Sequence, residues 1–62
     1  MRFDIGERVK LTKVRSYSDG TTIPVGAKGT VTQVYEPIES YLVEFDDYSP
    51  ARRVHEKFLA AA

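Results

Sequence analysis

Apolar and polar residues alternate in short runs along most of this chain, and this alternation restricts the fold more than any other feature. In residues 7–12, Val9 and Leu11 would face one way while Arg8 and Lys10 face the other. A period of two places successive side chains on opposite sides of a strand. Glycine, proline and aspartate separate the runs, as turn residues do. The pattern therefore predicts an all-β protein built from short strands.

Five strands are expected, together with one 3₁₀ turn. The strands are assigned to residues 7–12, 29–35, 41–45, 51–54 and 58–60. On the third of these, Tyr41, Val43 and Phe45 share one face. A single 3₁₀ turn is expected over residues 55–57, directly before the last strand. The alternative for this part of the chain is a helix across residues 51–61, because Val54 and Phe58 are four apart and alanine favours helix.

Two breaks in the alternation predict β-bulges. Val14 follows Leu11 by three residues, and Val34 follows Val31 by three. A bulge adds one residue to a strand, so the residues after it face the same side as before the break. A bulge near residues 12–13 would therefore return Val14 to the core. Gly29, at the start of the second strand, is expected to occupy a bulge or a left-handed position.

Residues 15–28 are expected to form one long loop. Asp19 and Gly20 are typical of a tight turn, and Pro24 suits the second position of a type I turn. Ile23 and Val25 would pin the loop to the core. A loop of this length in so small a chain is usually functional.

Together these elements predict a five-stranded SH3-like barrel that forms a single domain over residues 1–62, with the long loop after the first strand. Curling the sheet on itself would protect its edges from further strand pairing. The chain contains 62 residues and no cysteine. A core of this size is thin and has no disulfide to support it.

Three segments of the chain resemble a bacterial SH3-like domain of unknown function, about 60 residues long. They are residues 5–11, 26–31 and 42–46, which read IGERVKL, GAKGTV and LVEFD. The resemblance extends over residues 3–59 and implies a small prokaryotic SH3-like barrel. It implies nothing specific about activity.

Two better-understood groups share parts of this pattern. The electron-transport accessory proteins, such as the small peripheral subunit of photosystem I, are similar through residues 16–17, 29–31 and 43–46. The KOW domains of ribosomal and transcription factors are similar through Gly6, Val9 and residues 28–31. The first resemblance implies an accessory subunit, and the second implies RNA binding.

Composition argues against most catalytic and metal-dependent functions. The absence of cysteine and the single histidine argue against thiolate and histidine metal sites. Residues 26–30 lack the lysine followed directly by Ser or Thr that a phosphate loop requires. Asp46 and Asp47 supply far fewer oxygens than a calcium ion needs. We therefore expect no enzymatic activity, no cofactor and no metal.

The distribution of charge directs attention to one set of residues. Nine basic and nine acidic side chains give a net charge of zero, although residues 1–30 are basic and residues 31–62 are acidic. This asymmetry predicts either pairing between the two halves or one basic and one acidic face. Exposed tyrosines beside arginine are favoured binding anchors. The expected partner-binding residues are Arg8, Lys10, Arg15, Tyr17, Tyr48 and Arg52.

The sequence thus predicts a non-enzymatic protein-binding module or accessory subunit, cytoplasmic, without a membrane segment. The residue 15–28 loop and the basic first strand would contact a larger, acidic protein. The alternative is KOW-like nucleic-acid binding through Arg8, Lys10, Arg15 and Lys28, with Tyr17 stacking on a base. A third hypothesis is self-association through a sheet edge.

Overall fold

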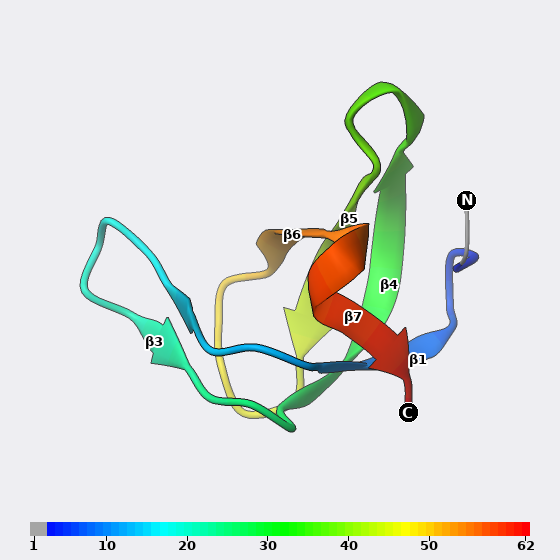
Figure 1. Cartoon of the computed structure of the whole chain (residues 1–62). Helices are drawn as coiled ribbons and strands as arrows, with labels where there is room; N and C mark the ends of the chain where they lie inside the picture. The colour runs from blue at the N-terminus through cyan, green and yellow to red at the C-terminus, as the bar shows by residue number, and fades with distance from the viewer. Residues whose placement is uncertain (1–2) are drawn as a thin grey trace.

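The computed structural model describes residues 3–62, and these residues form an all-β structure (Figure 1). The strands are β1 (Arg8–Leu11), β2 (Arg15–Ser16), β3 (Thr22–Ile23), β4 (Lys28–Tyr35), β5 (Ser40–Phe45), β6 (Arg52–His55) and β7 (Leu59–Ala61). Two 3₁₀ turns, η1 (Glu36–Ile38) and η2 (Glu56–Phe58), precede β5 and β7. The described residues contain no α-helix. The 3₁₀ turn before the last strand is therefore confirmed, one residue later than expected, and the helical alternative is wrong.

Five of the strands form one antiparallel sheet in the order β6-β5-β4-β1-β7. The two remaining strands, β2 and β3, pair only with each other. The predicted five-stranded barrel is therefore wrong: residues 3–62 form seven strands, and the outer strands β6 and β7 of the larger sheet do not pair. Two-residue strands are too short to show a period of two, which is why the sequence pattern did not indicate them.

Of the two predicted bulges, the structure contains the one in β4. The register between β4 and β5 shifts between Val31 and Gln33, so Val31 is buried and Val34 packs against the core. The bulge that would bury Val14 is absent, and Val14 is 55% exposed. The chain bends out of the sheet after Leu11, where the Thr12 amide donates to the Phe58 carbonyl oxygen. That departure leaves Val14 outside the core.

The core lies on one face of the five-stranded sheet and takes residues from six of the strands. Tyr41, Val43 and Phe45 are all buried on this face, as predicted. Phe3 covers one end of the core, with its ring edge-on to Tyr41 at 5.4 Å between centroids. The other buried apolar residues are Val9, Leu11, Ile23, Val31, Val54 and Leu59.

The predicted long loop contains the β2–β3 hairpin, which extends away from the five-stranded sheet in Figure 1. Ile23 pins it to the core, as expected, but Val25 is 62% exposed. At the tip, the Thr21 amide donates to Asp19 Oδ1, and Gly20 has a φ of 90°. The prediction of a tight turn at this point is confirmed, whereas the prediction of a structureless loop is wrong.

Gly29 lies in β4 opposite Phe45 and has neither a positive φ nor a place in the bulge. Its backbone approaches β5 closely instead. A Cβ atom at this position would lie 2.7 Å from the Glu44 carbonyl oxygen and 2.7 Å from Val43 Cγ1. Packing therefore requires glycine at this position, and the expectation that Gly29 occupies a bulge or a left-handed position is wrong.

Two ion pairs form within residues 3–62, and each joins the two halves of the chain. Arg8 pairs with Asp46, and Arg52 pairs with Asp19. The first of these pairs agrees with the expected pairing between the basic and acidic halves. No helix in this part of the chain has the length and hydrophobicity needed to span a bilayer.

Candidate functional site

Five side chains from three separate elements alternate between cation and aromatic ring. Their order is Arg52, Tyr17, Arg15, Phe58 and Lys57. The cation-to-centroid distances along this order are 4.8, 5.9, 4.6 and 5.2 Å. A cation within about 6 Å of a ring centroid is attracted by the ring quadrupole. We call these five residues the cation–aromatic row.

The row joins the hairpin to the rest of the molecule. Arg15 belongs to β2 and Tyr17 follows it, while Arg52 begins β6 and the other two residues belong to η2. The Tyr17 hydroxyl donates to the Arg53 carbonyl oxygen at 3.5 Å. Tyr17 and Phe58 are both partly buried and pack against the core. The row therefore holds the hairpin beside β6 and η2.

Arg52 forms the anchored end of the row. Its side chain is only 12% exposed, and its Nη2 donates to Asp19 Oδ2 at 2.8 Å and to Thr21 Oγ1 at 3.0 Å. The hydrogen bond from Arg52, together with those from Thr21, lowers the pKa of Asp19 from 3.8 to about 2. The carboxylate is thus ionised at neutral pH and ties the hairpin tip to β6.

Arg15, at the centre of the row, is held differently. Its guanidinium contacts the rings of Tyr17 and Phe58 but makes no hydrogen bond or ion pair within residues 3–62. Its Nε is buried without an acceptor. A guanidinium carries five N–H donors. Arg15 is therefore a positioned cation whose hydrogen-bonding capacity is unused by the described residues.

His55 sets the conformation of η2. Its Nδ1 accepts a hydrogen bond from the Lys57 amide at 3.1 Å, which caps the first turn of η2. Its ring also meets Phe58 edge-on, at 6.4 Å between centroids. His55, half-buried at the end of β6, therefore fixes the start of η2 and orients Phe58 in the row.

Arg8 and Lys10, two of the predicted binding residues, lie outside the row on β1. Arg8 donates two hydrogen bonds to the Asp46 carboxylate, at 2.8 and 2.6 Å, and a third to Thr30 Oγ1. The hydrogen bonds between Arg8 and Asp46 raise the pKa of Arg8 and lower the pKa of Asp46. Lys10 is exposed and lies directly opposite Lys28 on β4. Like charges placed opposite each other repel, so this pair is not neutralised across the strands.

Tyr48 also lies outside the row. It is partly buried and packs against the core from the turn between β5 and β6. Together with Thr30, Asp46 and Ser49 it lines a polar depression beside the Arg8–Asp46 pair. The structure therefore brings together three of the six predicted residues, Arg15, Tyr17 and Arg52, and places the other three elsewhere.

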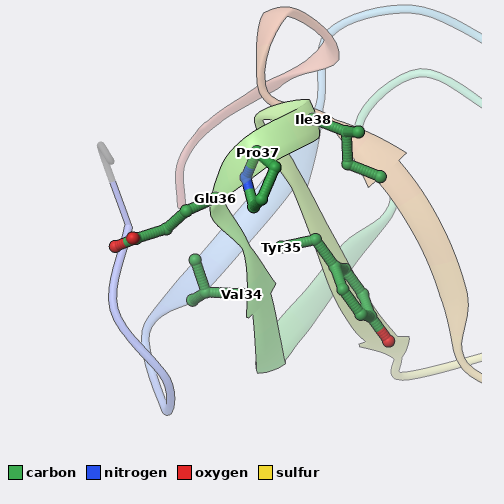
Figure 2. A pocket seen from close by; sticks show the side chains of 5 residues that line it. All are labelled: Val34, Tyr35, Glu36, Pro37 and Ile38. Atoms are coloured by element: carbon green, nitrogen blue, oxygen red, sulfur yellow. The ribbon is translucent and has the colours of Figure 1, made fainter.

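A second depression lies at the tip of the β4–β5 hairpin. It is lined by one continuous segment, residues 34–38, in which the side chains of Val34 and Glu36 project to one side of the ribbon and that of Tyr35 to the other (Figure 2). Arg53 lies 5.6 Å from the centre of the Tyr35 ring. No set of polar groups converges here, so this depression offers no chemistry beyond an apolar contact.

Sequence reasoning did not identify Lys57, Phe58 or Asp19 as parts of the site. Phe58 was expected in the last core strand, and Asp19 was interpreted only as a turn residue. The adjacent cation and ring at 57–58 were an available signal, but their neighbours in space could not be known. Comparison with protein-family models, with curated proteins and with solved structures finds no match to this chain.

Proposed function

We propose that this protein is a non-enzymatic binding module that contacts an acidic region of a larger protein. The observation that carries the proposal is Arg15, a guanidinium fixed between two rings and without an acceptor in the described residues. Lys57 extends the same surface and is exposed. Burying a cation on a partner is favourable when a carboxylate there accepts its hydrogen bonds.

The proposed contact surface differs in one respect from the surface expected from the sequence. The β2–β3 hairpin, within residues 15–28, remains the main contact, but the neighbouring contact is η2 and not the first strand. Arg8 is engaged with Asp46, so it offers less to a partner than its charge alone indicates. The proposed relationship to small SH3-like domains is supported by the long segment after β1 and by the 3₁₀ turn before β7.

Nucleic-acid binding is the second candidate, and the alternation of cations with rings favours it. Base stacking, however, needs an accessible ring face. Each ring of the row already contacts two cations, Tyr17 with the two arginines and Phe58 with Arg15 and Lys57. The N–H donors of the row are therefore more available to a partner than the faces of its rings. An acidic protein is thus the better candidate.

A titration of the ¹⁵N-labelled protein with two polyanions tests this choice. Poly-L-glutamate and an oligothymidylate of matched charge are added separately at low salt. We expect poly-L-glutamate to shift the amide resonances of residues 15–17 and 52–58, and the oligothymidylate to shift them less. The reverse order would favour nucleic-acid binding. If neither polyanion shifts these resonances, the proposal is wrong.

A further inference from the structure

We propose that Arg15 binds one carboxylate of a short acidic segment in the partner, and that the row accommodates at most two neighbouring carboxylates. This inference rests on the proposed function, because it specifies the chemistry that the same surface recognises. It makes a peptide of one or two acidic residues, rather than a long polyanion, the matching ligand.

The position of Arg15 favours a carboxylate. The planar fork of a guanidinium matches the two oxygens of a carboxylate. Its Cζ lies 4.6 Å from the centre of the Phe58 ring and 5.9 Å from that of Tyr17. These contacts restrict the side chain before any ligand arrives, so less conformational entropy is lost on binding.

Lys57 provides the place for a second carboxylate. Its Nζ lies 5.2 Å from the centre of the same Phe58 ring that Arg15 contacts. Neither cation has an ion pair among residues 3–62. Because both cations contact the one Phe58 ring, they are close enough for two neighbouring carboxylates to meet one cation each.

The number of uncommitted cations limits the length of the ligand. Asp19 already pairs with the Arg52 guanidinium at one end of the row. The row then leaves only Arg15 and Lys57 without an ion pair among residues 3–62. A longer run of carboxylates would meet no further unpaired cation of the row.

Calorimetry with two end-blocked peptides tests the proposal. The first has two adjacent glutamates flanked by Gly and Ser, and the second replaces both with glutamine. We expect saturable binding of the glutamate peptide only. Arg15→Gln and Lys57→Gln should each weaken it about tenfold, the effect of losing a charged hydrogen-bonded contact. Arg15→Lys should recover little, because it keeps the charge and loses the fork.

Lys10→Gln is the matched control, since it removes one exposed cation from a surface outside the row. It should leave the affinity within about twofold. A thermal melt of each variant identifies any loss of folding. Because Lys57 is exposed, its variant tests the site even if Arg15→Gln loosens the hairpin.

A third peptide, with about eight consecutive glutamates, separates the two proposals. Extended, it spans roughly 26 Å, close to the 28 Å longest dimension of the molecule. We expect it to bind no more than a few times tighter than the short peptide. An affinity that rises steeply with length and falls equally in Arg15→Gln and Lys10→Gln would overturn the inference and leave the proposed function standing. Absence of binding to both acidic peptides would contradict both.

Discussion

Gly29 is the one of the four glycines whose neighbours leave no room for a side chain. A Cβ atom there would lie 2.7 Å from both a carbonyl oxygen and a methyl carbon of β5. We expect Gly29→Ala to destabilise the protein by about 1–3 kcal/mol, the usual cost of overpacking, and Gly29→Val to cost more. Urea denaturation measures both. Gly20→Ala is the comparison, because it meets open space and costs only its left-handed conformation. A denaturation midpoint for Gly29→Val equal to that of the unmodified protein would show that β4 and β5 can separate freely.

Asp19 should make the hairpin sensitive to acid. Its pKa is lowered in the folded state, so its contribution to stability is complete above its usual pKa of 3.8 and is lost as the pH falls towards about 2. We expect hydrogen exchange at the hairpin amides to accelerate over this interval, after correction for the intrinsic rate. Asp19→Asn should remove that change. Asp47→Asn, which alters an exposed carboxyl without an ion pair in the described residues, should retain it.

At the scale of elements, the β2–β3 hairpin depends on side chains for its attachment. Its strands pair only with each other, and backbone hydrogen bonds connect its base to Leu11. Beyond that base, the hairpin is held by Ile23 in the core, by the row and by the Asp19–Arg52 pair. Such a segment opens more readily than strands within a continuous ladder. The row can therefore serve both to fix the hairpin and to present cations.

Tyr17 should be the most sensitive point of this attachment. Its ring contacts Arg15 and Arg52 and packs against the core, so Tyr17→Ala should destabilise the protein by about 1–3 kcal/mol. Tyr17→Phe keeps the ring and removes only a hydroxyl at 3.5 Å from its acceptor, and it should cost about 0.5 kcal/mol or less. Chemical denaturation of the two variants gives the comparison. Equal midpoints for Tyr17→Ala and the unmodified protein would mean that the row does not hold the hairpin.

At the scale of the whole molecule, the sequence predicts the strands in which apolar and polar residues alternate regularly. It does not predict features that depend on which residues become neighbours in the folded chain. The strands around Val9, Val31 and Val43 were predictable because their alternation matches one buried face. The phase slip at Val34 likewise indicated a bulge that exists. At Val14 an identical slip marks a bend out of the sheet. Spacing alone cannot distinguish the two outcomes.

The candidate site shows the same limit. Arg15, Tyr17 and Arg52 could be singled out by residue type, but their mutual contact depends on where the hairpin folds. Phe58 was not added to them, since the apolar run Phe58-Leu59-Ala60 was interpreted as the last strand. The sequence pattern also could not predict whether the sheet closes, because closure depends on whether the outer strands β6 and β7 pair in the folded chain.

The thin core leads to a final prediction about the last strand. β7 pairs with β1 through Leu11↔Leu59 and Val9↔Ala61, and Leu59 is buried. Loss of a buried leucine side chain alone costs about 2–5 kcal/mol, and a chain of this size has roughly 3–5 kcal/mol to lose. Removal of residues 59–62 also exposes the β1 edge. We therefore expect the truncated chain to be unfolded at 25 °C, with no cooperative urea transition followed by far-UV circular dichroism.

Two controls make this truncation informative. Removal of Ala62 alone deletes one hydrogen bond to the Arg8 carbonyl oxygen, so it should cost no more than about 1.5 kcal/mol and leave the urea m-value unchanged. Leu59→Ala in the full chain separates the lost core contact from the lost strand pairing, and its stability should lie between those of the two truncations. If the chain without residues 59–62 instead unfolds cooperatively with the m-value of the full chain, β7 is dispensable. The sheet would then be stable as β6-β5-β4-β1 with Leu11 open to solvent, which the burial of Leu11 beside Leu59 argues against.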